Sequence, residues 1–225
     1  MIVLMIIAGG LLLIVIFGPQ WWVKHTLARY AEPANRYGGS GAQLARHLLD
    51  QAGLHAVVVE STALGDHYDP LAKAVRLSPQ CFEARSLTAI TVAAHEVGHA
   101  LQDAEADKGL RLRTRLAPIL HYGSVLASVL LIAGPVLAVV VRAPALLWLA
   151  LIAAFSVQLL ATIMTLVTLP VEWNASFGRA LPMLEREGIL LAGDLPHARR
   201  LLLAAALTYV SASLVSILFL LRFLR

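Results

Sequence analysis

The sequence is poor in cysteine and in charged residues. One cysteine in 225 residues, Cys81, excludes an internal disulfide framework and any zinc site built from several thiolates. Charged residues make up 14% of the chain and hydrophobic residues 59%, whereas an ordinary soluble domain carries about 25% charged residues. This composition predicts a membrane protein. The net charge of +4 is modest, and most Lys and Arg residues flank apolar runs, so the charge does not indicate a nucleic-acid surface.

Four apolar runs are each long enough to span a bilayer core of about 30 Å, and they predict four transmembrane helices. They cover residues 2–23, 119–141, 145–169 and 201–221. The first run lacks the basic start and the small-residue cleavage site of a signal peptide, so we interpret it as an uncleaved anchor. A very short turn joins the second and third runs into an antiparallel hairpin, and Pro170 is expected to end the third.

The residues between the first two runs have the composition of a small soluble domain. Ser40 and Gln43 form a capping-box pattern, which predicts a helix that ends near Gly53. Short strands are expected at 57–59 and 73–78, paired as a hairpin around a turn-rich loop. The expected fold is therefore a mainly α membrane protein, with about four transmembrane helices and a small α+β domain inserted between the first and the second. A helix that contains His95-Glu96-Val97-Gly98-His99 is expected after the strands, and this order of elements is zincin-like.

The chain therefore divides into five predicted segments. They are an anchor helix at 1–23, a catalytic segment at 24–117, a transmembrane hairpin at 118–170, a polar segment at 171–200 and a last transmembrane helix at 201–225. Alternation across the membrane places the catalytic and the polar segments on the same side. That side carries most of the basic residues near the membrane: Lys24, Arg29, Arg111, Arg113, Arg115, Arg179, Arg199 and Arg200, against Arg142, Arg222 and Arg225 on the other. The positive-inside rule then predicts an integral protein of a prokaryotic cell membrane with its site in the cytoplasm.

The segment His95-Glu96-Val97-Gly98-His99 carries the chemistry. Two histidines four residues apart on a helix lie on one face and can bind the same tetrahedral Zn²⁺, with the glutamate as general base. The residues before this motif are apolar, so His95, Glu96 and His99 belong to a helix that is otherwise buried. Three buried polar groups need partners, and one bound zinc ion per chain satisfies them together.

A catalytic zinc site also needs a third protein ligand. Asp103 would lie beyond the metal, and other nearby groups are better explained as solvated or interfacial residues: Glu105, Asp107 and His121. Cys81 could act as the thiolate ligand of a deformylase-like site, but its apolar setting favours a buried structural thiol. Glu172 follows the third apolar run on the side of the motif, and its residue type and position fit either a zinc ligand or an interfacial acid.

Several stretches spread along the chain resemble the YugP-type membrane zinc metallopeptidases. They are Ser40-Gly41-Ala42, Asp66-His67-Tyr68-Asp69-Pro70, Val75-Arg76-Leu77-Ser78, Ala93-Ala94-His95-Glu96-Val97-Gly98-His99-Ala100-Leu101-Gln102, Leu169-Pro170-Val171-Glu172-Trp173-Asn174-Ala175-Ser176 and Ala205-Ala206-Leu207-Thr208-Tyr209-Val210. This resemblance implies a membrane-embedded zinc protease with His95 and His99 as ligands and Glu96 as the catalytic residue. It also favours Glu172 as the third ligand.

The chain is more distantly similar to the HtpX-type membrane proteases, which take a glutamate as third ligand. Those proteins have an acid four residues after that glutamate, where this chain has Ser176. A carboxylate that orients a zinc histidine would therefore have to come from elsewhere, and Asp66 or Asp69 is the expected source.

The predicted activity is that of a zinc metalloendopeptidase acting on peptides or membrane proteins at the lipid bilayer. Glu96 would take a proton from water and return it to the leaving amine, and one further donor would stabilise the oxyanion. Four residues are candidates for that donor: His67, Tyr68, Asn174 and Tyr209. The alternative is a non-enzymatic membrane scaffold with a structural zinc. A structural site usually has four protein ligands, and only three good candidates are present, which favours an enzyme.

Overall fold

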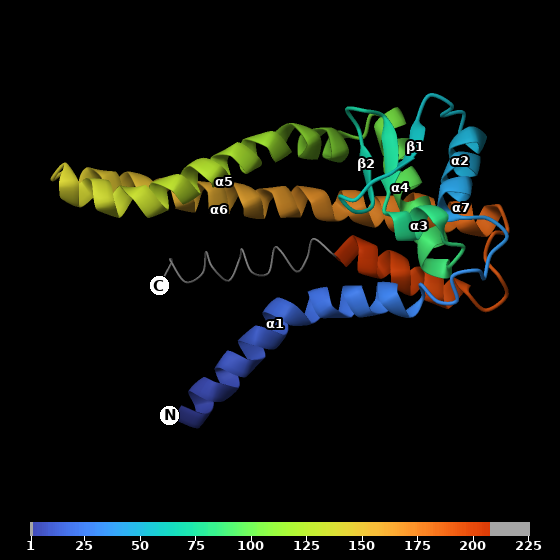
Figure 1. The fold of residues 1–225 in the computed structure, drawn as a ribbon, viewed down its shortest axis with the longest axis horizontal. Helices are drawn as coiled ribbons and strands as arrows, with labels where there is room; N and C mark the ends of the chain where they lie inside the picture. Colours follow the sequence, from blue (N-terminus) through green and yellow to red (C-terminus); the bar gives the residue numbers. More distant parts are fainter. Residues whose placement is uncertain (1, 208–225) are drawn as a thin grey trace.

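The computed structural model describes residues 2–207, most of which are helical. The elements, in chain order, are α1 (Ile2–Arg29), α2 (Gly41–Gln51), β1 (Val58–Ser61), β2 (His67–Asp69), β3 (Ala74–Leu77), α3 (Pro79–Glu83), α4 (Leu87–Ala104), α5 (Lys108–Val140), α6 (Ala145–Trp173), the π-helix η1 (Asn174–Ala180) and α7 (Leu181–Arg186). Residues 195–207 form one more helical stretch. The long helices α5 and α6 run side by side as an antiparallel hairpin, and the shorter elements gather in a head at one end of it (Figure 1).

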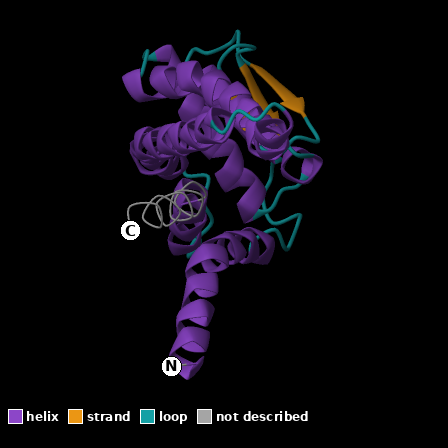
Figure 2. Ribbon diagram, turned by 90° about the vertical axis from the view of Figure 1, so that its left-hand side faces the viewer, coloured by secondary structure: helices purple, strands orange, loops and turns teal. Residues whose placement is uncertain are grey.

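The strands form one small sheet at an edge of the head (Figure 2). Its order is β1-β3-β2, with β1 parallel to β3 and β2 antiparallel to β3. The expectation that the segments around 58–61 and 74–77 pair as a hairpin is therefore wrong. The loop between them contains β2, which takes the antiparallel position beside β3 and leaves β1 on the other side.

The core of the head forms around α4 and α2. The predicted capping box at the start of α2 is confirmed, because the Ser40 side chain accepts from the Gln43 amide and the Gln43 side chain accepts from the Ser40 amide. Gly41 lies so close to α3 and α4 that a Cβ atom there would be 2.2 Å from the carbonyl oxygen of Cys81. Only glycine allows this approach, so the small residue after the cap fixes how α2 packs on the zinc-motif helix.

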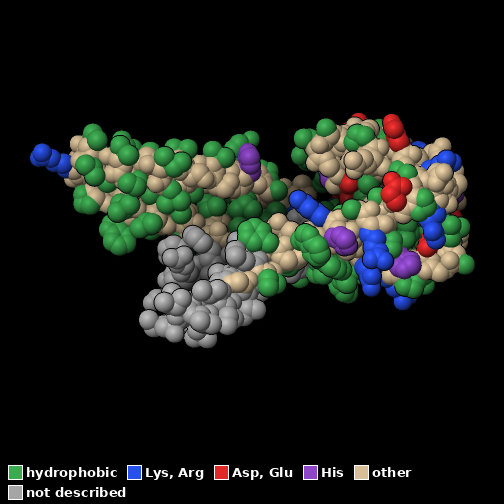
Figure 3. Space-filling view, turned by 60° about the horizontal axis from the view of Figure 1, so that its bottom comes forward, with side chains coloured by type: hydrophobic (Ala, Val, Ile, Leu, Met, Phe, Trp, Pro, Cys, Tyr) green, Lys and Arg blue, Asp and Glu red, His purple; other side chains and the backbone are tan. Residues whose placement is uncertain are grey.

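The α5–α6 hairpin has the opposite character, because its large apolar side chains point outward. Among the described residues, two helices are long and apolar enough to cross a membrane, Lys108–Val140 and the stretch Ala145–Arg186 that begins with α6. Figure 3 shows hydrophobic side chains along the hairpin, while the acidic side chains on this face gather on the head. These two helices match the second and third predicted spans.

Pro170 does not end the third run, contrary to expectation. Helix α6 continues through Pro170 to Trp173, and η1 and α7 follow without an intervening loop. A short helix, α7, covers Leu181–Arg186 within the predicted polar segment. Transmembrane helices tolerate proline where neighbouring groups satisfy the freed backbone, so a proline near the end of an apolar run is a weak stop signal.

The first and last predicted spans are described only in part. Helix α1 includes the predicted anchor and continues through Pro19 to Arg29, where it reaches the head. Asp194 directly precedes the helical residues 195–207, which include the start of the last predicted span. The rest of that span lies outside the described residues. The division into four transmembrane helices and the five segment boundaries stay predictions.

Candidate metal centre

Helix α4 presents the zinc motif from inside the core. Its start is fixed by Ser86, whose side chain accepts from the Ala89 amide. The motif lies two turns further along, and the one-turn spacing of His95 and His99 puts both rings on the same face. His95, Glu96 and His99 are all buried, so the predicted set of polar groups on an apolar helix is present.

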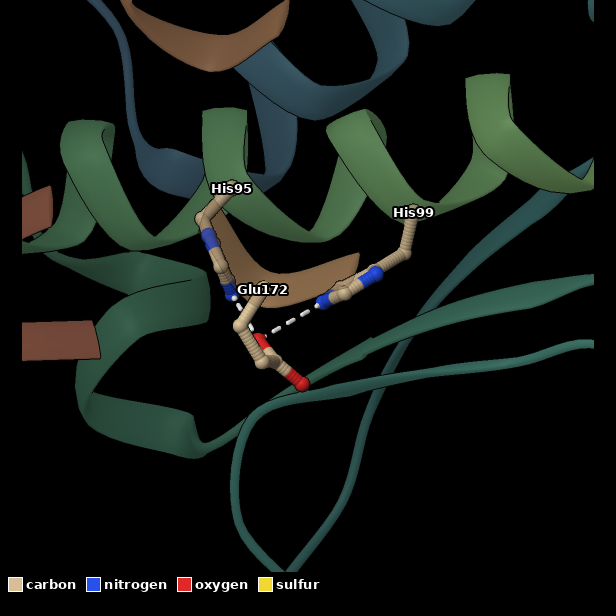
Figure 4. A group of neighbouring side chains, drawn as sticks. All are labelled: His95, His99 and Glu172. Atoms are coloured by element: carbon tan, nitrogen blue, oxygen red, sulfur yellow. Dashed lines mark hydrogen bonds and ion pairs between the residues drawn. The ribbon is translucent and has the colours of Figure 1, made fainter. Parts of the chain in front are cut away.

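The last turn of α6 brings Glu172 to the two histidines (Figure 4). Its Oε2 atom lies 3.1 Å from His95 Nε2 and 3.2 Å from His99 Nε2. The three residues are buried, and one donor atom from each lies within 4.8 Å of the others. Neighbouring ligands on a tetrahedral zinc ion, with bonds of about 2.0–2.1 Å, are roughly 3.3 Å apart. The donor set and its spacing therefore fit zinc.

Two neutral side chains orient the imidazole rings. Ser176 Oγ donates to the Leu202 carbonyl at 3.1 Å, so it accepts from His95 Nδ1 at 3.0 Å. Gln102 donates its amide hydrogens to Val171 O and Asn174 Oδ1. Its remaining oxygen, Oε1, then accepts from His99 Nδ1 at 2.9 Å. Both rings thus carry their proton on Nδ1 and turn the Nε2 lone pair toward Glu172.

Electron-pair donors therefore converge on one buried point. Two Nε2 lone pairs and the carboxylate oxygen of Glu172 repel one another unless a cation lies between them. The buried contacts of the rings thus argue for a metal on physical grounds that are independent of the sequence motif. The histidine partners also correct an expectation: the residue at position 176 itself orients His95, although it is a serine and not an acid.

Arg113 is a further part of the site that the sequence did not reveal. It lies on α5, and its Nη1 atom donates to Glu172 Oε1 at 2.7 Å. This bond leaves Oε2 facing the histidines, so Glu172 offers one oxygen to the metal position. In the sequence, Arg113 is one of several basic residues near a membrane span, and no spacing rule connects it to a glutamate 59 positions later.

Gly98 allows α4 and η1 to approach closely enough to assemble the site. A Cβ atom at Gly98 would lie 2.7 Å from the Ala175 carbonyl oxygen. The backbone of η1 therefore passes directly over the zinc-motif helix. The wider turn of this π-helix follows Glu172 and contains Ser176, and such insertions often mark functional sites in helices.

A cavity of about 300 Å³ opens beside the three candidate ligands. Glu96 and Arg113 line it, as do His67 and Tyr68 from the edge strand β2. Burial, the largest effect, raises the pKa of Glu96 to about 7, although the nearby His95 opposes the shift. A carboxyl group with a pKa in that range can both take and return a proton near neutral pH.

The four predicted oxyanion donors differ in whether they line the cavity and in which bonds they already make. His67 lines the cavity, but its Nδ1 atom donates to the Gly65 carbonyl at 2.8 Å. Tyr68 also lines it, with its hydroxyl donating to Asp103 at 2.7 Å. Asn174 is exposed and accepts from Gln102. Tyr209 lies outside the described residues.

The two acids expected to orient a zinc histidine bind elsewhere. Asp66 accepts from the backbone amide and the hydroxyl of Ser78, although it still lines the cavity. Asp69 caps the turn after β2 through the amides of Leu71 and Ala72. The expectation that either one supports a zinc histidine is therefore not met by the bonds of this structure.

The residues set aside as ligands do not belong to the group of three donors. Cys81 is a buried free thiol whose pKa is raised to about 12 by burial, which suits a structural role. Glu105 forms an ion pair with Arg179. Asp107 accepts from the Leu110 amide at the start of α5, and His121 is exposed.

The fold and the site together define a protein with two helices long and apolar enough to cross a membrane and a buried His-His-Glu cluster that could hold a metal ion. Residues 2–225 match the family described as "Putative neutral zinc metallopeptidase", and the chain belongs to that family. It is 41% identical over 209 residues to "Putative membrane protease YugP" of Bacillus subtilis (strain 168), covering 92% of this chain and 89% of that protein. No solved structure matches the chain.

Proposed function

We propose that the protein is an integral-membrane zinc endopeptidase that hydrolyses peptide bonds at the cytoplasmic surface of a prokaryotic membrane. His95, His99 and Glu172 would hold the metal, in the His-Glu-x-x-His arrangement with a glutamate as third ligand. The buried convergence of these three donors carries the proposal, and the family and the membrane-protease relative support it.

Zinc bound at this position would supply a Lewis acid that polarises a peptide carbonyl and acidifies water. Glu96 lies next to the ligands, lines the same cavity and would take the proton from water before passing it to the leaving amine. Ser176 and Gln102 hold the imidazole rings in the tautomer that the metal requires.

Arg113 would stabilise the negative charge that develops on the carbonyl oxygen. The guanidinium group stays charged at all relevant pH values and has several donors. One of them contacts Glu172, and the side chain lines the cavity. Arg113 brings a positive charge into the cavity, whereas His67 and Tyr68 bond to Gly65 and Asp103, so Arg113 fits this role better than either predicted candidate.

The position of β2 at the edge of the sheet favours a peptide as the substrate. Its inner side pairs with β3, and no other described strand pairs with its outer side. His67 and Tyr68 on this strand line the cavity that contains Glu96. An extended peptide can add to such an edge through backbone hydrogen bonds, which would bring its carbonyl groups past the metal.

The test compares purified full-length wild type with Glu96→Gln, both loaded with zinc, on a library of quenched fluorescent peptides. We expect equal zinc content, with kcat/KM lower by about 10³-fold or more in the variant, because the proton acceptor is lost. Glu105→Gln, at an exposed surface acid, is the matched control and should retain activity. A zinc-loaded Glu96→Gln protein that cleaves as well as wild type would contradict the mechanism. A structural zinc scaffold would bind zinc and cleave none of the peptides.

A further inference from the structure

A second and larger cavity lies beside the metal cavity. It has a volume of about 630 Å³, which is within the usual range for ligand pockets. Leu27, Asp66 and Val92 line both cavities, so the two adjoin at these residues. Val92 on α4 precedes His95 and Glu96 by one helical turn, and the same face of α4 therefore runs from one cavity into the other.

The walls of the second cavity are mostly apolar and built from small residues. Helix α1 and the residues after it form one wall, and α3 with the first half of α4 forms the other. Five alanines line it: Ala28, Ala31, Ala34, Ala84 and Ala89. A hydrogen bond links the two walls, because the Thr88 hydroxyl on α4 donates to the Leu27 carbonyl of α1 at 2.8 Å. The space thus belongs to a fixed junction between α1 and α4.

The thiol and the carboxylate that line the cavity already bond within the protein. The Cys81 thiol and the Asp66 carboxylate contact each other there at 3.5 Å. Asp66 also accepts both bonds from Ser78, which occupies one of its oxygens. Three further polar residues of the lining, Lys24, Glu32 and Gln80, are exposed, so the deeper part of the wall that an incoming group would meet is mostly apolar.

We propose that this cavity is the subsite that receives a large apolar side chain of the substrate, next to the bond that is cleaved. The inference rests on the proposed peptidase function. A peptide extended along β2 advances about 3.3 Å per residue, so a residue adjacent to the scissile bond reaches past the shared wall of Leu27 and Val92. Leucine and phenylalanine match the apolar lining, and a lysine or glutamate side chain would lose its hydration there. The predicted anchor helix α1 thereby contributes to substrate selection.

The experiment uses zinc-loaded full-length protein in nanodiscs and peptides that vary at one position beside the cleaved bond. Wild type should cleave peptides with Leu or Phe there at least about tenfold better than peptides with Ala. Ala28→Phe and Ala84→Phe fill the cavity from opposite walls, and each should lower kcat/KM for the Leu and Phe peptides about tenfold. Cleavage of the Ala peptide should change less than about twofold.

The matched control is Ala104→Phe, at an exposed alanine on α4 that lines neither cavity. It should retain the wild-type preference, and zinc content should be the same in all three variants. The use of two filling variants keeps the test valid if one of them fails to fold. Equal losses for every peptide, or a wild type without preference for large apolar residues, would overturn the subsite. A lipid as the natural occupant would produce that second result.

A binding measurement separates this proposal from the peptidase function. Labelled peptides of the same series are titrated onto Glu96→Gln, with and without Ala28→Phe, and followed by fluorescence anisotropy. Preferential binding of the Leu and Phe peptides that is lost on Ala28→Phe supports the subsite even if wild type cleaves no peptide. Cleavage by wild type without any such preference supports the peptidase and overturns the subsite.

Discussion

The head and the membrane hairpin use apolar residues in opposite ways. In α4, 15 of 18 residues are buried, whereas in α5 only three of 33 are buried. Burial in the head surrounds polar ligands with protein, and exposure along the hairpin suits contact with lipid. The metal centre joins the two regions, because His95 and His99 come from the head and Glu172 from the end of the hairpin. A helix that is long and apolar enough to cross a membrane thus supplies part of the candidate metal centre.

The largest expected effect comes from removing the ligand that the hairpin contributes. Glu172→Gln keeps the shape of the side chain but loses its charge toward the two imidazoles. We expect zinc affinity to fall by more than about 100-fold, beyond what loss of a supporting hydrogen bond causes. Metal content after dialysis against a zinc buffer measures it, with Glu105→Gln as the control. Full zinc occupancy in Glu172→Gln would show that the head binds the metal without the hairpin.

A glycine comparison tests the junction between the two regions. In Gly98→Ala the new methyl group would lie 2.7 Å from the Ala175 carbonyl oxygen, so α4 and η1 must separate. We expect the free energy of unfolding to fall by about 1–3 kcal/mol, together with weaker zinc binding. Gly123→Ala lies inside the hairpin, where a Cβ atom would meet Val157 at 3.4 Å. Thermal unfolding should be nearly unchanged there, and an equal loss in both variants would argue against a special junction.

Removing the hydrogen bond from His95 to Ser176 should have a smaller effect on zinc binding. Ser176→Ala removes the acceptor that holds the His95 tautomer, but all three metal donors remain. Zinc affinity should fall by about 10–100-fold, the usual range for such supporting groups. Competition with a chelator of known affinity gives this number. Ser128→Ala, at an exposed serine of α5 that bonds only locally, should leave the affinity unchanged. Unchanged affinity in Ser176→Ala would mean that packing alone orients the ring.

The smallest effect is expected at an ion pair that fixes the start of the last helical stretch. Arg36 and Tyr37 both donate to the buried Asp194. Burial alone would raise the pKa of Asp194, but these bonds outweigh it and lower the pKa below its usual value. A carboxyl group with a lowered pKa stabilises the fold above its unfolded-state pKa of about 3.9. That contribution is lost as the pH falls through the folded-state value.

Asp194→Asn should therefore lower the free energy of unfolding by about 1 kcal/mol at neutral pH. The difference from wild type should shrink below about pH 4. Unfolding followed at pH 7 and on the acid side of pH 4 measures both effects. Asp50→Asn, which removes a surface pair with Arg46, is the control and should have little effect at either pH. A difference for Asp194→Asn that stays constant with pH would contradict the assigned ion pair.

Local patterns predicted the parts of the site that depend on one segment. The spacing of His95 and His99, with Glu96 between them, required only that 87–104 form a helix, and apolar residues before the motif indicated its burial. The capping box at Ser40 is local in the same sense. The two central membrane helices followed from long apolar runs. Each of these features is encoded within one or a few helical turns.

The parts that sequence reasoning missed depend on contacts between distant segments. Arg113 and Ser176 act on partners 59 and 81 positions away. Gln102 acts on His99, three residues before it, but its orientation depends on a bond to Val171, 69 positions away. Strand β2 has three residues, too few for an alternating pattern. Glu172 could be named as a ligand only through family resemblance, because an acid at the end of an apolar run also fits the membrane interface.

The uninterrupted helical stretch from Ala145 to Arg186 has a mechanical consequence. Most of its length is apolar, and it runs beside α5, so its tilt in a bilayer would depend on that packing and on the match to the bilayer thickness. Glu172 is part of this rod, with no flexible loop between it and the lipid-facing residues. A change in bilayer thickness that tilts the rod must therefore shift the glutamate relative to the two histidines, which the head holds in place. In a bilayer, membrane thickness would thus act on the alignment of the three candidate ligands.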